Sequence, residues 1–126
     1  ISVGASTINY NKDLIAYFSN YGQRNVDIYA PGYQIYSTTP NDNYDFKNGT
    51  SMAAPSVTGV ASLILSYFPR ISAKKLKEII LESGIDFNFS VNHDDKDILF
   101  ENLSKSGKIV NAYNALILAS GKKINK

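Results

Sequence analysis

The stretch FKNGTSMAAPSVTGVASLIL, residues 46–65, begins as a loop and continues as a helix. Gly49 gives the backbone freedom just before the helix begins. Pro55 follows Ser51 by four positions, so it removes an amide that would otherwise bond to the Ser51 carbonyl. A segment that served only as a stable helix would not carry glycine and proline around its first turn. The stretch therefore predicts a long helix with a specialised beginning at Ser51.

The rest of this helix, from Ser51 to Phe68, carries apolar or small residues on almost every side, and Pro69 ends it. These residues are Met52, Ala53, Ala54, Val57, Val60, Ala61, Leu63, Ile64 and Leu65. A helix that is apolar all round is usually buried at the centre of a large body. We therefore expect a long buried helix with neighbours beyond these 126 residues.

The segments on either side of this helix predict an α/β layer architecture with a mostly parallel sheet, because strands are followed by helices. Short strands are expected at residues 1–6, 26–32, 33–39 and 44–46, with a turn at 40–43. Two further helices are expected, one capped by Ser72 and one capped by Asn111 and ended by Gly121. Residues 84–106 are expected to be irregular.

Composition excludes several classes of protein. The net charge of +2 is too small to indicate a nucleic-acid or anionic-membrane partner. The chain has no cysteine, so it has neither a disulfide framework nor a thiolate metal site. No apolar run is long enough for a transmembrane helix. An ordinary globular domain fits these properties.

The position of Ser51 suits a nucleophile. A serine hydroxyl needs a base to take its proton and donors to hold the oxyanion that its attack creates. The first amides of a helix are unpaired and the helix dipole is positive there, so both favour developing negative charge. The simpler interpretation is that Ser51 or Thr50 only caps the helix.

The segment NGTSMAAP, Asn48 to Pro55, resembles the serine motif of the subtilisin-like serine proteases, the subtilases of the peptidase S8 family. The resemblance extends to most of the chain and is weakest at residues 84–106. It covers VGAS at 3–6, FSNYG at 18–22, VDIYAPG at 26–32, IYSTTP at 35–40 and GKIVNAYNAL at 107–116. This resemblance implies the later part of a three-layer α/β/α domain, in which the long buried helix follows the nucleophile.

Carried over by position, the resemblance implies that Ser51 is acylated during hydrolysis of a peptide or protein substrate. The backbone N–H of Ser51 would be one oxyanion donor, and Thr50 would lie beside it. Asn48 and Gly49 would border the substrate cleft, and Met52 would pack behind the nucleophile. Family members often have histidine after the motif proline, whereas this chain has Ser56, but that histidine is not the catalytic base.

The family's chain order is Asp, His, then Ser, with an oxyanion Asn between the last two. The only histidine here, His93, follows the serine within NHDDKD, and we expect it to be a solvated surface residue. Because the sequence opens at Ile1 rather than Met, we expect residues 1–126 to be the C-terminal portion of a catalytic domain. The N-terminal portion would be its partner. Alone, the chain is expected to be inactive, and either to pair with that portion as a separate chain or to self-associate.

Two rival functions stay open at this point. One is a pseudo-protease that keeps the fold as a binding or scaffolding module, and the other is a lipase-like or penicillin-binding acyl hydrolase. The missing Gly-x-Ser-x-Gly elbow disfavours the second. We expect no cofactor or metal ligand in this chain, although calcium is possible in a full-length family member. Bacterial subtilases are usually exported, which implies a bacterial protein that is secreted or held in the cell envelope.

Overall fold

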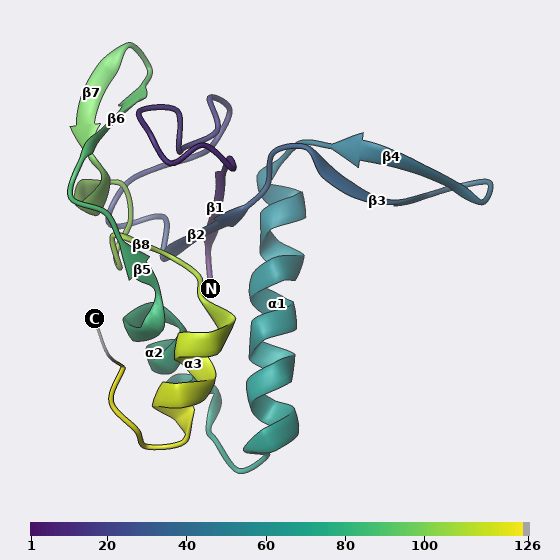
Figure 1. Cartoon of the computed structure of the whole chain (residues 1–126), viewed down its shortest axis with the longest axis vertical. Coiled ribbons are helices and arrows are strands. Elements are labelled where there is room, and N and C mark those ends of the chain that lie inside the picture. Colours follow the sequence, from purple (N-terminus) through teal and green to yellow (C-terminus); the bar gives the residue numbers. More distant parts are fainter. Residues whose placement is uncertain (125–126) are drawn as a thin grey trace.

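The computed structural model describes residues 1–124 as a mixed α/β fold with a mostly parallel sheet, as predicted (Figure 1). The strands are β1 (Val3–Ser6), β2 (Ile28–Pro31), β3 (Ile35–Thr39), β4 (Asn43–Lys47), β5 (Ile85–Asp86), β6 (Ser90–His93), β7 (Lys96–Leu99) and β8 (Lys108–Ile109). The helices are α1 (Thr50–Tyr67), α2 (Ala73–Ser83) and α3 (Ala112–Ala119), with one 3₁₀ turn, η1 (Phe100–Asn102).

The main sheet has the order β1-β2-β8-β5. Strand β2 is parallel to both β1 and β8, whereas the short β5 runs antiparallel to β8. The remaining strands form two separate antiparallel hairpins, β3–β4 and β6–β7. The sheet thus places the carboxyl ends of β1 and β2 at one edge, and the loops that follow them meet there.

The side chains of β2 alternate between the two faces of the sheet, as a strand requires. Ile28 and Ala30 belong to the core cluster beneath the three helices. Tyr29 points to the opposite face and packs with Val91 and Phe100 from the segment after α2. Burial raises the pKa of Tyr29, so its hydroxyl stays protonated and serves as a buried donor. The helices therefore cover one face, and hairpin β6–β7 with η1 covers the other.

The ends of the helices follow from local capping, as the sequence predicts. The Ser72 side chain accepts a hydrogen bond from the Lys75 amide at 3.2 Å, at the start of α2. The Asn111 side chain accepts one from the Asn114 amide at 2.8 Å, at the start of α3. Helix α1 begins and ends within one residue of the predicted bounds.

Helix α1 is buried on one side only. Ala53, Val57 and Ile64 face β1, β2 and the other helices, whereas Leu63 and Leu65 are each 37% exposed. The expectation of burial on every side is therefore not met within this chain, because nothing in residues 1–124 packs on the outer side of α1 (Figure 1). Despite its length, α1 is not apolar enough to cross a bilayer, and neither is any other helix in the described part of the chain.

Residues 84–106 are not irregular, which corrects the prediction. They contain β5, hairpin β6–β7 and η1. The hairpin turns at Asp94 and Asp95, both of which have positive φ, 52° and 57°. Aspartate tolerates this conformation in tight turns, so the acidic run forms the turn of a hairpin.

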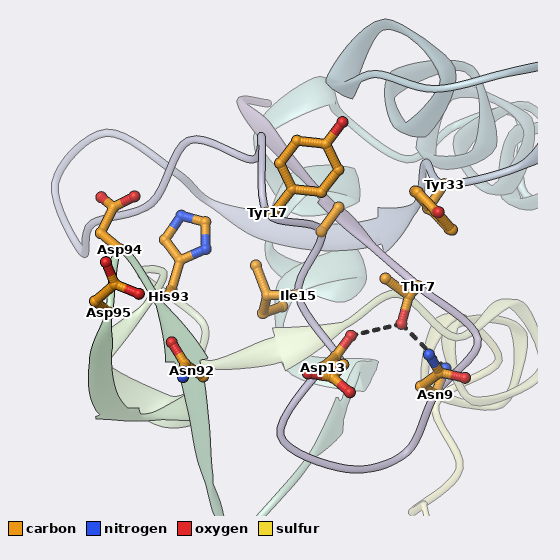
Figure 2. Close-up of a pocket in the computed structure, with 11 residues that line it drawn as sticks. Thr7, Asn9, Asp13, Ile15, Tyr17, Tyr33, Asn92, His93, Asp94 and Asp95 are labelled. Atoms are coloured by element: carbon orange, nitrogen blue, oxygen red, sulfur yellow. Dashed lines mark hydrogen bonds between the residues drawn. The ribbon is translucent and has the colours of Figure 1, made fainter.

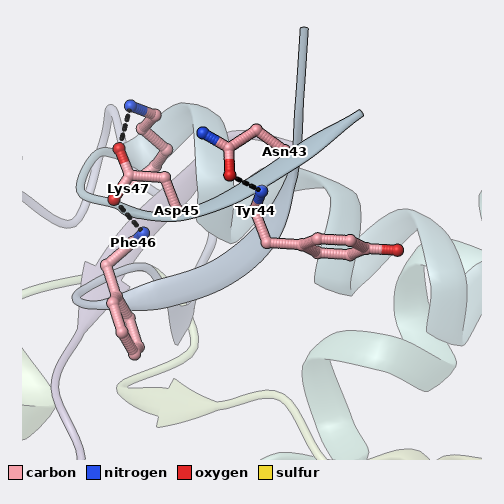
Figure 3. Close-up of polar contacts among 5 residues, drawn as sticks. All are labelled: Asn43, Tyr44, Asp45, Phe46 and Lys47. Atoms are coloured by element: carbon pink, nitrogen blue, oxygen red, sulfur yellow. Dashed lines mark hydrogen bonds and ion pairs between the residues drawn. The ribbon is translucent and has the colours of Figure 1, made fainter. Parts of the chain in front are cut away.

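Hairpin β3–β4 projects from the body beside the beginning of α1 (Figure 1). The Tyr36 ring packs against the rings of Tyr44 and Phe46, and each of the three side chains is more than half exposed. Figure 3 shows Asp45 accepting hydrogen bonds from the Phe46 amide and the Lys47 ammonium. The Lys47 contact holds the pKa of Asp45 below its usual value. Strand β4 ends at Lys47, so Asn48 is the first residue after the hairpin.

Candidate active site

The segment before α1 is attached to the end of β2 by a backbone hydrogen bond. The Gly49 amide donates to the Gly32 carbonyl at 2.9 Å. Gly32 has no room for a side chain, because a Cβ would lie 2.7 Å from the Ala5 Cβ and 2.8 Å from the Gly49 carbonyl oxygen. Gly49 itself has φ 153°, a conformation that favours glycine. Close backbone approach therefore fixes the position at which α1 begins.

Asn48 closes the neck of hairpin β3–β4. Its Oδ1 accepts a hydrogen bond from the Gln34 amide at 2.6 Å. This contact joins the residue that precedes β3 to the residue that follows β4. The two ends of the hairpin are thus held together immediately before Gly49 and Ser51. Asn48 is exposed, so its side chain is at the surface beside the serine.

Ser51 lies in the first turn of α1 and is exposed. The first helical bonds are made by the amides of Met52 and Ala53, which both donate to the Gly49 carbonyl at 3.0 Å and 3.3 Å. Within residues 1–124, the amides of Thr50 and Ser51 have no backbone acceptor. The helix dipole adds a partial positive charge at the same place. An anionic oxygen beside Ser51 would therefore meet free donors and a favourable potential.

The two residues that flank Ser51 are partly covered by the rest of the chain. Thr50 and Met52 are half-buried, and the Met52 sulfur lies closest to Gly49, 3.4 Å from where a glycine Cβ would stand. Neither Ser51 nor Thr50 caps the helix, because Gly49 is the N-cap residue and has no side chain. The simpler interpretation of Ser51, a capping role, is therefore wrong.

His93 is not the surface residue that the sequence predicts. It is 3% exposed, and its ring stacks edge-on against Tyr21 with ring centroids 4.8 Å apart. Its Nε2 lies 2.9 Å from the Ser19 carbonyl oxygen. The ring is buried because hairpin β6–β7 packs over the loop that contains Ser19. This bond joins His93 to Ser19, and the structure does not bring His93 to Ser51.

Asp27, the residue before β2, forms an ion pair with an ammonium group from α2. Lys77 Nζ lies 2.8 Å from Asp27 Oδ2, and the Ser2 amide donates to the same oxygen at 2.9 Å. Burial alone would raise the pKa of Asp27, but these two donors and the Lys77 charge outweigh it and lower the pKa. Among the described residues, no group of three or more histidines, cysteines or carboxylates could hold a metal ion.

Two residues of this arrangement were not identified from the sequence. Gly32 was assigned only to the end of a strand, although its carbonyl and its missing side chain position Gly49. Gln34 uses its backbone amide to hold Asn48, which no side-chain pattern could predict. The signal for Gly32 was available, because a Pro-Gly pair directly after a buried strand indicates a close backbone approach.

Comparison with known proteins connects this geometry to one family. The family model described as "Subtilase family" matches residues 1–111. Subtilisin DY of Bacillus licheniformis is 46% identical over 77 residues, which cover 61% of this chain and 27% of that protein. A subtilisin-like protease of the fungus Coccidioides posadasii is 43% identical over 101 residues, covering 80% of this chain and 24% of that protein. With fungal relatives present, a bacterial origin is not supported.

Solved structures give the same result for the fold. A structure of the subtilase cytotoxin SubAB superposes with a TM-score of 0.74 and 25% sequence identity. The match covers 95% of this chain and 36% of that chain. The matched part of this chain thus spans between 24% and 36% of these three proteins.

Proposed function

Because this chain belongs to the subtilase family, we propose that it carries the nucleophile of a serine endopeptidase and that Ser51 is that nucleophile. The observation that supports this most directly is the exposed Ser51 in the first turn of α1, beside two amides that have no backbone acceptor within residues 1–124. Thr50 borders this oxyanion position. Asn48 and Gly49 line the substrate cleft, and Met52 packs behind the serine.

In the proposed reaction, Ser51 Oγ attacks the carbonyl carbon of a peptide bond while a histidine takes the hydroxyl proton. The oxygen of the carbonyl becomes an oxyanion and accepts a hydrogen bond from the Ser51 amide. Cleavage of the C–N bond releases the amine, which leaves with the proton, and Ser51 is left as an ester. Water then attacks this ester, the acid product departs, and Ser51 regains its hydroxyl hydrogen.

The other catalytic groups are proposed to lie outside these residues. In the family's chain order, the aspartate, the histidine and the oxyanion asparagine precede the serine. His93 follows the serine and bonds to Ser19, so it is not proposed as the base. The N-terminal part of the catalytic domain would then complete the site. Subtilases are commonly secreted, and we propose export to the cell envelope or beyond for this protein also.

A fluorophosphonate probe on the full-length protein tests the proposal, because it labels only a serine whose hydroxyl is activated. We expect labelling to be lost in Ser51→Ala and retained in Ser56→Ala, a control five residues further along α1. Labelling that persists in Ser51→Ala would overturn the assignment of the nucleophile. Absence of labelling in the folded wild-type protein would favour the pseudo-protease, which keeps the fold but has lost a partner of the serine.

A further inference from the structure

A cavity lies at the carboxyl ends of β1 and β2, apart from the residues proposed for catalysis. It has a volume of about 540 Å³. Thr7 follows β1, Tyr33 follows β2, and the turn of hairpin β6–β7 forms the far wall (Figure 2). Neither Ser51 nor any other proposed catalytic residue lines it. The cavity therefore needs an explanation of its own.

The charged groups around this cavity all have the same sign. Asp13 lies on one side, and Asp94 and Asp95 lie on the other (Figure 2). No lysine or arginine lines the cavity. Within residues 1–124, none of these three carboxylates forms an ion pair, and the nearby Lys12 pairs with Asp97 instead, at 3.4 Å. The cavity thus has a negative potential that no described side chain neutralises.

The buried His93 supplies a further acceptor. Its Nε2 faces the Ser19 carbonyl oxygen, which can only accept, so Nε2 carries the hydrogen. In the neutral ring Nδ1 therefore has a free lone pair, and this buried atom has no hydrogen-bond partner among the described residues. In Figure 2 the ring edge with Nδ1 is turned toward Ile15 and the middle of the cavity, away from Asp94 and Asp95. A buried acceptor without a donor is costly, and a donor from a ligand would remove that cost.

We propose that this cavity binds an organic cation that carries N–H donors, the guanidinium or ammonium group of an arginine or lysine side chain on a bound peptide. Three carboxylates and one ring nitrogen are all acceptors, so they match a ligand that only donates. The 79% exposed Tyr17 ring at the rim offers a face to such a cation. A metal ion is disfavoured, since these carboxylates and His93 do not form a metal-binding group.

The proposal does not depend on the proposed catalytic role of Ser51. The test therefore uses the folded Ser51→Ala protein, in which hydrolysis plays no part. We would titrate it with Nα-acetylarginine amide and with Nα-acetylcitrulline amide, which has the same shape and no charge. Arginine is expected to bind about tenfold more tightly, as a charge-assisted contact predicts. In ¹⁵N NMR spectra, the His93 Nδ1 signal should shift with arginine only.

Variants locate the site. Asp94→Asn and Asp95→Asn together should weaken arginine binding about fivefold, and asparagine accepts the positive φ of both positions. Asp86→Asn is the matched control, because Asp86 is exposed and does not line the cavity, and it should leave the affinity unchanged. Equal binding of arginine and citrulline, or equal affinity in all variants, would overturn the proposal. Either result would leave the fluorophosphonate test of Ser51 unaffected.

Discussion

Two glycines of this chain differ in the space available for a side chain. Gly32 is enclosed by Ala5, Ala53 and the Gly49 carbonyl, so any side chain there would push against the backbone that precedes Ser51. Gly59 lies in the middle of α1, and nothing lies within 4 Å of where its Cβ would be. The same substitution should therefore have opposite effects at the two positions.

We expect Gly32→Ala to lower the free energy of unfolding by about 1–3 kcal/mol, because the added methyl overpacks the contact with Gly49. Gly59→Ala should raise it by about 0.5–1 kcal/mol, since alanine is the better helix former. Urea unfolding followed by circular dichroism measures both. In the full-length protein, Gly32→Ala should also reduce the proposed fluorophosphonate labelling of Ser51. Equal stability of the two variants would show that Gly49 is not held against Gly32.

At the scale of elements, the sequence predicted the three helices because their ends carry local signals. Ser72 and Asn111 cap α2 and α3 through bonds to residues only three positions away. Hairpin β6–β7 was missed because the polar run around Asp94 resembles a loop, whereas its pairing and the burial of His93 depend on packing against Ser19. The hydrophobic periodicity of residues 90–99 carries no information about the distant Ser19 loop against which they pack.

The Asp27–Lys77 pair joins β2 to α2 and gives a prediction with a pH dependence. Because the folded pKa of Asp27 is lowered, its contribution is present above the unfolded value and is lost as the pH falls through the folded value. Lys77→Met should therefore lower the free energy of unfolding by about 1 kcal/mol at pH 7, and by less below about pH 3. Unfolding in urea at the two pH values measures this difference.

The matched control is Lys75→Met. Lys75 forms the exposed pair with Glu78 at 3.6 Å on the same helix, and such a pair contributes little. Lys75→Met should change stability by less than about 0.5 kcal/mol at either pH. If the two lysine variants behave alike, Asp27 does not depend on Lys77.

At the scale of the whole molecule, the local motif alone predicts Ser51, Gly49 and Asn48 as site residues, because they are close together in the sequence. The contact between Gly49 and Gly32 could not be identified in this way, since it forms only when β2 and α1 come together. The cavity around His93 is likewise built from three separate segments. A site whose residues are adjacent in the chain can be predicted from sequence, whereas a site assembled from distant segments cannot.

With Ser51 in its proposed role, residues 1–126 alone are expected not to hydrolyse casein, because the residues of a catalytic triad act as a unit and one of them by itself retains little of the rate. The outer side of α1, with Leu63 and Leu65, should make the isolated chain associate with itself or with the N-terminal part of the domain. A casein assay and analytical ultracentrifugation of the purified chain measure these two properties.

Leu65→Lys should reduce the association, whereas Tyr113→Lys, at the 74% exposed Tyr113 of α3, should not. Turnover of casein by the isolated chain that disappears in Ser51→Ala would contradict the expected inactivity. It would mean that these residues supply a base of their own. A strictly monomeric chain would contradict the expected association through the outer side of α1.

The closed neck of hairpin β3–β4 has an evolutionary consequence. Asn48 accepts a hydrogen bond from the Gln34 amide, and the Gly49 amide donates one to the Gly32 carbonyl. The position of Ser51 is therefore set at the base of the hairpin and not by its tip. Insertions, deletions or substitutions in the tip between Thr39 and Asn43 leave these two hydrogen bonds in place. Selection can therefore diversify the tip at little risk to Ser51, and insertions among related genes should accumulate there while the neck keeps its length.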